Sequence, residues 1–260
     1  MTAILRAESR QRIRGPILLT AVLWIFTVFY FSIFPGFADD ADELVEGFPD
    51  YIFDLFGLDA LHTIEGFIAA ELYSFFWSLL VAIYFAYIGA GLIAGDIGSR
   101  KLDLTLSNPV SRESVLLQKV ASLWVPLLIL NVGVAVPVYL GSVIIGEPIS
   151  PVALAMVHLL SVPYHLVCAA IGVLLSVVLA HVRTARSAAF GLVILLWLVD
   201  AFSRLQADFE WIGAFTPSRY WEETDILVHE EYAFLDAGIL LVAFIVLIGV
   251  ALFVFIRRDI

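Results

Sequence analysis

Long apolar runs separated by polar segments dominate this chain of 260 residues. A transmembrane helix needs about 20 predominantly apolar residues, whereas membrane-spanning strands would alternate apolar and polar residues over about 10 positions. No such alternation is seen, and backbone in lipid must satisfy its own hydrogen bonds. The pattern therefore predicts an all-α integral membrane protein with six transmembrane helices, at residues 17–34, 72–94, 120–145, 152–180, 188–202 and 237–256.

Proline, glycine and charged residues refine these boundaries. Pro35 and Gly36 are predicted to end the first span. Pro126 and Pro137 predict kinks rather than breaks in the third span, because neighbouring helices can satisfy the freed carbonyls. Acidic residues at the outer edges of two spans, Glu71 and Asp200, are interpreted as solvated helix ends.

The composition agrees with a membrane protein. The chain is 62% hydrophobic with a mean hydropathy of +0.98, whereas soluble domains are about 45–50% apolar. Its single cysteine, Cys168, excludes an intramolecular disulfide framework.

The charges are distributed unevenly, and this predicts an orientation. If both termini are cytoplasmic, 12 of the 14 Lys and Arg residues lie on the inner side, leaving Arg204 and Arg219 outside. This asymmetry is what sets membrane topology. We therefore expect cytoplasmic N- and C-termini, an inner loop at residues 95–119, and acidic outer loops at residues 36–66 and 203–236. Apolar residues at helical spacing between residues 44 and 58 predict a short amphipathic helix on the outer face.

Residues 1–15 combine four arginines with a modest apolar side formed by Ile4, Leu5 and Ile13. This pattern predicts an interfacial elbow helix at the inner leaflet, whose arginines reach lipid phosphates. The alternative is a frayed basic N-terminus that only sets topology.

Candidate chemistry is sparse. Neither lysine is followed by Ser or Thr, so the chain has no GxxxxGK[ST] loop for nucleotide phosphates. No HExxH or GxSxG motif is present, which disfavours a hydrolase. His158, His165 and Cys168 share one helix and are weak candidates for a soft metal, but polar packing inside a bundle is the commoner role for such residues. No metal, no directly bound cofactor and no nucleic-acid partner are therefore expected.

The polar segment at residues 95–119 has the sequence GDIGSRKLDLTLSNPVSRESVLLQK. It is far longer than a helix–helix connection, which needs only about 2–8 residues. Pro109 forces Asn108 out of helical geometry, and Ser111 can then cap a new helix. The segment therefore predicts a short cytoplasmic helix, a break, and a capped helix that leads into the membrane. Such an element can dock on a soluble partner.

This segment resembles the first cytoplasmic loop of ABC-2-type permeases. That loop has an acidic residue, a Gly-Thr-Leu-rich helix, a Pro-Val-Ser-Arg break and a Leu-Leu-x-Lys sequence before the third span. The chain departs from the pattern at Arg100-Lys101, where the family usually has Gly-Thr. Residues 215–227, FTPSRYWEETDIL, resemble the segment before the last span of the same family. The matching residues in the first loop are Asp96, Leu102, Leu104 to Leu106, Pro109, Val110, Ser111, Arg112, Leu116, Leu117 and Lys119.

The resemblance implies an exporting permease subunit of an ATP-driven ABC transporter that is not itself an enzyme. ATP would be bound by a separate cytoplasmic ABC subunit, and a second permease copy, identical or related, would complete the membrane domain within the lipid. The implied coupling residues are Asp96, Arg100, Lys101, Asp103, Pro109, Val110, Ser111, Arg112 and Glu113. The alternatives are an ATP-independent channel or secondary transporter, and a non-transporting membrane anchor. The substrate-binding residues are unknown from sequence.

Overall fold

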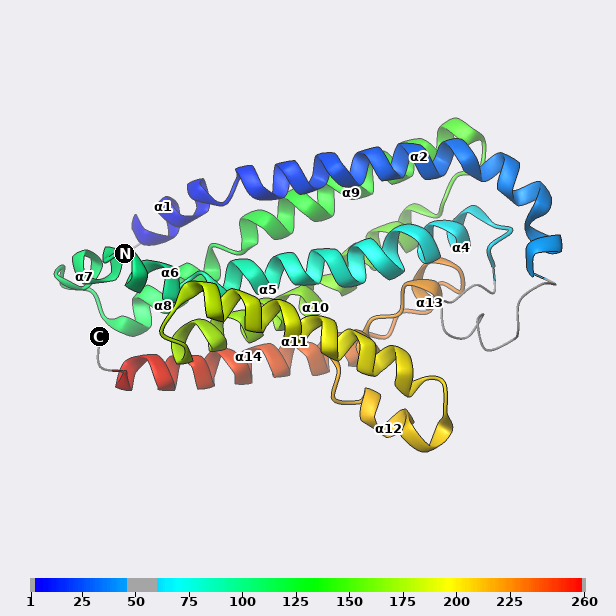
Figure 1. The fold of residues 1–260 in the computed structure, drawn as a ribbon. Helices are drawn as coiled ribbons and strands as arrows, with labels where there is room; N and C mark the ends of the chain where they lie inside the picture. Colours follow the sequence, from blue (N-terminus) through cyan, green and yellow to red (C-terminus); the bar gives the residue numbers. More distant parts are fainter. Residues whose placement is uncertain (1–2, 46–59, 259–260) are drawn as a thin grey trace.

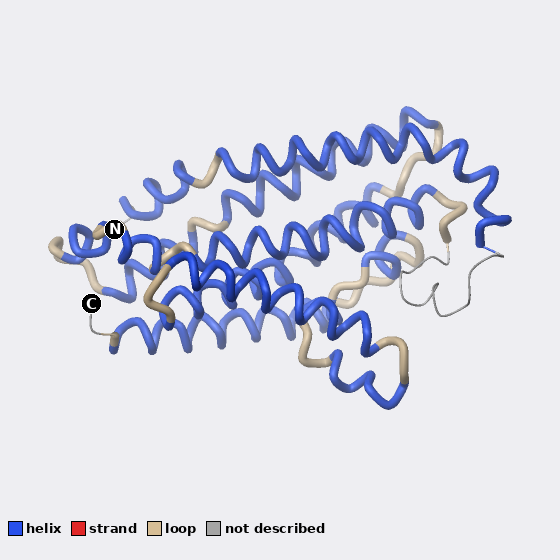
Figure 2. Tube along the Cα trace, viewed as in Figure 1, coloured by secondary structure: helices blue, strands red, loops and turns tan. Residues whose placement is uncertain are grey.

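The computed structural model describes residues 3–45 and 60–258, and within these ranges the chain is helical without any strand (Figures 1 and 2). Six helices are long and apolar enough to cross a membrane, which confirms the predicted fold class. They are formed by α2 (Arg14–Val45), η1 with α5 (Ala69–Val81 and Ala82–Ala90), α8 with α9 (Arg112–Ala121 and Trp124–Ile145), α10 (Pro151–Val178), α11 (Val182–Ser203) and α14 (Phe234–Arg257).

Shorter elements lie at the two ends of this bundle (Figure 1). Both termini lie at one end, together with α1, α6 and α7, while α4, α12 and α13 lie at the other. The bounds of these elements are α1 (Ala3–Gln11), α4 (Ile64–Ile68), α6 (Ala94–Gly98), α7 (Lys101–Leu106), η2 (Ala207–Phe209), α12 (Glu210–Gly213), η3 (Pro217–Tyr220) and α13 (Glu223–Leu227).

The predicted stop at Pro35 and Gly36 is wrong, because α2 continues through both residues to Val45. A proline inside a helix removes one hydrogen bond and bends the helix without having to end it, and α2 curves near its end (Figure 1). Aromatic packing continues across Pro35. Phe34 and Phe37 place their rings 5.3 and 5.0 Å from the ring of Phe67. The amphipathic helix predicted between residues 44 and 58 falls largely outside the described residues.

The third span is interrupted before Pro126 rather than at it. α8 ends at Ala121 and α9 begins at Trp124, so Pro126 lies in the first turn of α9. The missing N–H of a proline costs little there, because first-turn N–H groups have no partner within the helix. Pro137 lies within an uninterrupted α9. The break therefore separates α8 from the membrane-crossing part of the span.

α10 is the central helix of the bundle. Two thirds of its apolar window is buried, 67% against 22% for α11 and for α14. It packs most extensively against α5 and α14 and also contacts α9 and α11. A helix that is apolar around its whole circumference and covered by neighbours forms the core of a bundle.

Two glycines let α5 and α10 approach closely. A Cβ atom on Gly89 would lie 2.2 Å from the Ala169 carbonyl oxygen, and a Cβ atom on Gly172 would lie 2.1 Å from the Ala86 carbonyl oxygen. The two contacts are reciprocal, since each glycine faces the backbone beside an alanine of the other helix. Small residues at such crossings allow the close backbone packing that stabilises helices in a membrane.

We expect Gly172→Ala to destabilise the protein by about 1–3 kcal/mol, because the added methyl group forces the two helices apart. The thermal midpoint of the purified protein in detergent should fall by several degrees. The control is Gly249→Ala in α14, where a Cβ atom would meet nothing within 4 Å. Equal midpoints for the two variants would contradict close packing at this crossing.

Candidate functional site

The segment from α6 to α8, residues 94–121, forms a helical hairpin at the end of the bundle that carries both termini (Figure 1). Arg100, in the left-handed region with φ 55°, joins α6 to α7. The chain turns again at Asn108-Pro109, and the Ser111 hydroxyl accepts a hydrogen bond from the Ser114 N–H at 3.3 Å. Ser111 is therefore the N-cap of α8, as its position after Pro109 predicted.

The short helix α7 has one side buried against the bundle and one side exposed. Leu102 is fully buried against the bundle, while Leu104 is 72% exposed. Arg100, Lys101 and Asp103 are also exposed around it. The tip of the hairpin thus presents one apolar side chain surrounded by charges of both signs, which is the composition of a small protein-docking surface.

A buried lysine connects this hairpin to the N-terminal helix. The side chain of Lys119 is only 2% exposed, and its ammonium lies 2.6 Å from a Glu8 carboxylate oxygen and 2.7 Å from an Asp96 carboxylate oxygen. Glu8 also pairs with Arg12 at 2.7 Å. These four residues are called the Lys119 network. It joins α1, α6 and α8 through one buried cation, and burying a charge costs much free energy unless the charge is paired.

Two further contacts fix the same face of α1 on α8. The Arg12 guanidinium donates to the Ser122 hydroxyl at 2.8 Å, and the Leu5 N–H donates to the Gln118 side-chain oxygen at 3.2 Å. The elbow helix is thus attached to α8 along its length, rather than lying as an independent element.

Arg112 connects the start of α8 to the end of the last span. Its guanidinium donates to the carbonyls of Phe255, Ile256 and Arg258, the last at 2.5 Å. In turn, the Arg258 guanidinium donates to the Val177 carbonyl at 2.6 Å and to the Leu179 carbonyl. Because the final carbonyls of a helix lack intrahelical partners, the two arginines cap α14 and α10 and tie both helices to the hairpin.

The start of α6 is tied to α10 as well. The Ser176 hydroxyl accepts hydrogen bonds from the N–H groups of Ile93 and Ala94 at 2.9 and 2.8 Å. These donors lie where α5 gives way to α6, so a buried serine satisfies backbone that the break would leave unpaired. Ser176 thereby holds the hairpin to the central helix.

The structure thus places the sequence-predicted coupling residues in three groups. Arg100, Lys101, Asp103, Pro109 and Ser111 are exposed, while Asp96 and Arg112 face the bundle in ion pairs or hydrogen bonds. Val110 and Glu113 are half-buried. Sequence reasoning missed the roles of Glu8 and Lys119. Glu8 is the only acid among the N-terminal arginines, and that isolation was the available signal.

The weak metal candidates pack as aromatic and hydrogen-bonded core residues. His158 lies 2.9 Å from the Tyr73 hydroxyl, and His165 Nε2 lies 3.2 Å from the Trp77 carbonyl. A carbonyl only accepts, so the geometry requires a proton on His165 Nε2. Within the described residues no three His, Cys, Asp or Glu side chains come together as a metal site.

The partners of His158 and His165, Tyr73 and Trp77, belong to an unusual helix. η1 is a π-helix of 13 residues, and two of its carbonyls bond to α10. The Tyr164 hydroxyl donates to the Ser78 carbonyl at 2.5 Å, in addition to the contact between His165 and Trp77. Wide π turns are rare and occur mainly at functional positions. Buried side chains of α10 thus support the irregular part of the second span.

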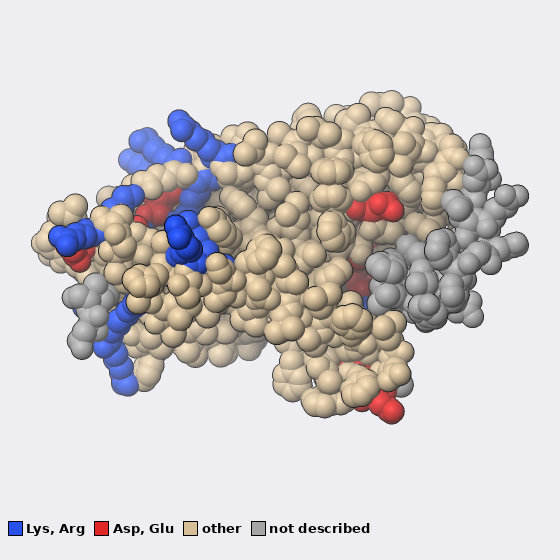
Figure 3. Space-filling view, in the orientation of Figure 1, with Lys and Arg blue, Asp and Glu red and all other residues tan. Residues whose placement is uncertain are grey.

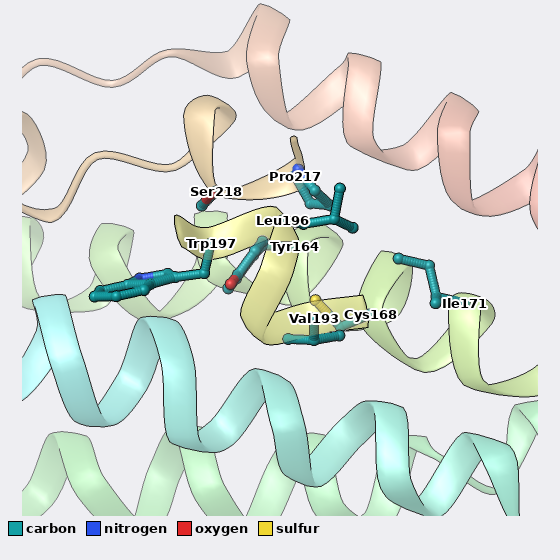
Figure 4. A pocket seen from close by; sticks show the side chains of 8 residues that line it. All are labelled: Tyr164, Cys168, Ile171, Val193, Leu196, Trp197, Pro217 and Ser218. Atoms are coloured by element: carbon teal, nitrogen blue, oxygen red, sulfur yellow. The ribbon is translucent and has the colours of Figure 1, made fainter. Parts of the chain in front are cut away.

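Cys168 and Tyr164 also line a small cavity between α10, α11 and η3 (Figure 4). Val193 and Trp197 come from α11, and Ser218 comes from η3. Its volume is about 10 Å³, which is at the lower limit for one water molecule, whereas ligand pockets measure about 300–1,000 Å³. The bundle is therefore closed at this position.

At the opposite end, Asp200 is not the solvated helix end that its position suggested, because it is only 5% exposed. Arg204 pairs with Asp200 at 3.0 Å and with Glu222. Arg219 pairs with Glu210 at 2.7 Å and lies 3.9 Å from Asp200. The segment between α11 and α14 folds back over the end of α11 and brings Glu210, Arg219 and Glu222 to this position, so the Asp200 carboxylate becomes buried and paired. Glu71, by contrast, is exposed.

Glu223 lies beside this cluster without a basic partner within ion-pair distance among the described residues. Burial and the neighbouring Glu222 carboxylate raise the pKa of Glu223 from an ordinary value of 4.5 to about 8. The pKa of Glu222 is raised as well, because burial outweighs its pairing with Arg204. Acidic groups thus outnumber the two arginines at this end.

The fold therefore defines a multi-pass membrane protein with a helical hairpin of mixed charge at one end and a network of paired acids at the other. The family model described as ABC-2 family transporter protein matches residues 2–260. The chain belongs to this family and is a permease subunit of an ABC transporter in the cell membrane. A search among curated proteins finds no match.

We expect Lys119→Met to destabilise the protein by about 3–5 kcal/mol, because it leaves the largely buried Asp96 carboxylate without a cation and Glu8 with Arg12 alone. Thermal unfolding in detergent is the measurement. The exposed Lys101→Met is the control and should have little effect. The neutral triple variant Glu8→Gln/Asp96→Asn/Lys119→Met should recover much of the loss. If the triple variant is no more stable than Lys119→Met, the ion pairs are not the cause.

The raised pKa of Glu223 predicts a pH dependence of stability. Between pH 4.5 and about 8 the folded state holds a proton that the unfolded state has lost, so the unfolding free energy falls as pH rises through this window. Glu223→Gln should flatten this fall and raise the thermal midpoint at pH 8.5 relative to the unmodified protein. The exposed Glu147→Gln is the control, and an unchanged profile in Glu223→Gln would contradict the assignment.

Proposed function

We propose that the α6–α8 hairpin is the contact through which a separate ATP-binding subunit drives this permease. The observation that carries the proposal is the combination of an exposed tip and a buried base. The tip presents Leu104 among charges, and the base is bonded to α1, α10 and α14. A displacement of the tip by a partner would therefore act on three other helices at once.

The distribution of charge supports a cytoplasmic position for this tip. Lys and Arg gather at the end of the molecule that carries both termini (Figure 3). Basic residues mark the cytoplasmic side of membrane proteins. The termini and the hairpin are then on the side where ATP is available, and the acidic cluster around Asp200 faces outward.

In the proposed mechanism, ATP binding moves the partner subunits and the attached hairpins between two positions. The bundle follows by a population shift between inward-open and outward-open states, because the partner contacts the hairpin differently in each state. Export is the direction we propose, with two permease copies, identical or related, forming the complete membrane domain.

Two variants separate docking from transmission. Leu104→Glu places a charge on the apolar centre of the tip, so we expect loss of partner-ATPase binding with an unchanged thermal midpoint. Arg112→Ala/Glu113→Ala removes the bonds to α14, so we expect partner binding to persist while permease-stimulated ATPase activity is lost. The measurements are co-purification and ATPase activity of the reconstituted complex.

The matched control is Leu235→Glu, a similarly exposed leucine at the start of α14. It lies at the opposite end of the bundle from the hairpin tip and should retain both properties. If Leu104→Glu binds and stimulates the ATPase normally, the hairpin tip is not the docking surface.

A further inference from the structure

The elbow helix α1 has two faces with different environments. Glu8 and Arg12, four residues apart, form the face whose side chains bond to Lys119 of α8 and to Ser122 at its end. Arg6 and Arg10 are one turn apart on another face and are both exposed. The bonds to α8 therefore fix the direction in which this second face points.

This second face borders a groove between α1 and the start of α9. The groove has a volume of about 650 Å³. The groove exists because α1 packs along α8 while α2 packs along α9. The break at residues 122–123 separates α8 from α9. The lining residues are Leu5, Arg6, Ser9, Arg10 and Ile13 of the N-terminal segment and Trp124, Val125, Leu128 and Ile129 of α9.

The arginines at the rim carry charge that the described protein does not neutralise. Two cations one turn apart on a helix repel each other. The only acid in α1 is Glu8, which already pairs with Arg12 and Lys119. No carboxylate lies within ion-pair distance of Arg6 or Arg10 among the residues the structure describes. The rim is thus complementary to an anion, and guanidinium groups bind phosphate oxygens in pairs.

The floor of the groove is apolar and would bind an apolar part of a ligand rather than an anion. Trp124 and Leu128 are 52% and 53% exposed, and they lie beside Val125 and Ile129 where α9 begins. An exposed tryptophan at such a level is typical of the membrane interface, with aliphatic residues extending toward the hydrocarbon. A ligand that fills the groove must therefore join an anionic group to an apolar chain.

We propose that this groove binds one anionic phospholipid, with its phosphate between Arg6 and Arg10 and an acyl chain along Trp124 and Leu128. The assignment to the cytoplasmic leaflet rests on the proposed orientation. A bound lipid would bridge α1 and α9 across the break at residues 122–123, beside the Lys119 network. It would then hold the elbow against the third span at the point where the helix itself is interrupted.

The test is binding of phosphatidylglycerol and phosphatidylcholine to the purified full-length chain in detergent, measured by native mass spectrometry and thermal shift. We expect one phosphatidylglycerol bound per chain with a rise in thermal midpoint. Arg6→Gln/Arg10→Gln should weaken phosphatidylglycerol binding by at least about tenfold and leave phosphatidylcholine binding unchanged. Because both arginines are exposed, folding should be preserved.

Three comparisons define the outcome. Arg14→Gln/Arg183→Gln removes two exposed charges outside the groove and should bind phosphatidylglycerol normally. Leu128→Trp fills the floor and should reduce binding with both arginines present. Glycerol 1-phosphate, which lacks acyl chains, should not stabilise the protein. Equal losses in the two double variants would show a diffuse charge effect, and stabilisation by glycerol 1-phosphate would show an anion site only. Either result would overturn the proposal, and neither depends on a partner ATPase.

Discussion

The burial of the Lys119 ammonium is the constraint on which the cytoplasmic half of the proposed mechanism depends. A buried cation requires carboxylates on more than one side, and these come from α1 and α6. Removing either helix from α8 would leave charges without partners, so the three elements are expected to move as one body. A flexible connection would absorb a push from a partner subunit. In the proposed mechanism, the paired charges would let the hairpin transmit it.

Arginine and serine extend this rigid body to the spans by capping rather than by side-chain packing. Arg112, Arg258 and Ser176 all bond to backbone groups at helix ends or breaks. Such bonds are directional and short in reach, so they can be exchanged between two discrete arrangements more readily than an interdigitated core can. The close crossing at Gly89 and Gly172 depends instead on backbone packing, which cannot be exchanged between two arrangements in this way. The α5–α10 pair is therefore the part of the bundle least free to rearrange.

The six spans and the hairpin could be predicted from sequence because hydropathy and turn residues act locally. The cap at Ser111 and the break at Pro109 are set by neighbours within four residues. The pairing of Glu8 with Lys119 joins positions 111 residues apart, and no local pattern encodes it. Asp200 was misread for the same reason, since Arg219 and Glu222, which complete the cluster around Asp200 and Arg204, come from a later segment. The helix stop predicted at Pro35 was wrong for another reason. Phe34 and Phe37 both pack on Phe67, and this packing supports α2 beyond the proline.

The π-helix η1 faces the same central helix from which Ser176 reaches the hairpin. Tyr164 and His165 hold the irregular carbonyls of Ser78 and Trp77 in the part of α10 that lies farther from the hairpin. Gly172 and Ser176 follow along α10 toward the hairpin. One helix therefore carries, in order, a support for an irregular turn, a fixed crossing and a contact with the hairpin. If a shift of the hairpin is transmitted through Ser176, the close crossing at Gly89 and Gly172 lies next to it on α10, so α5 and α10 are expected to move together.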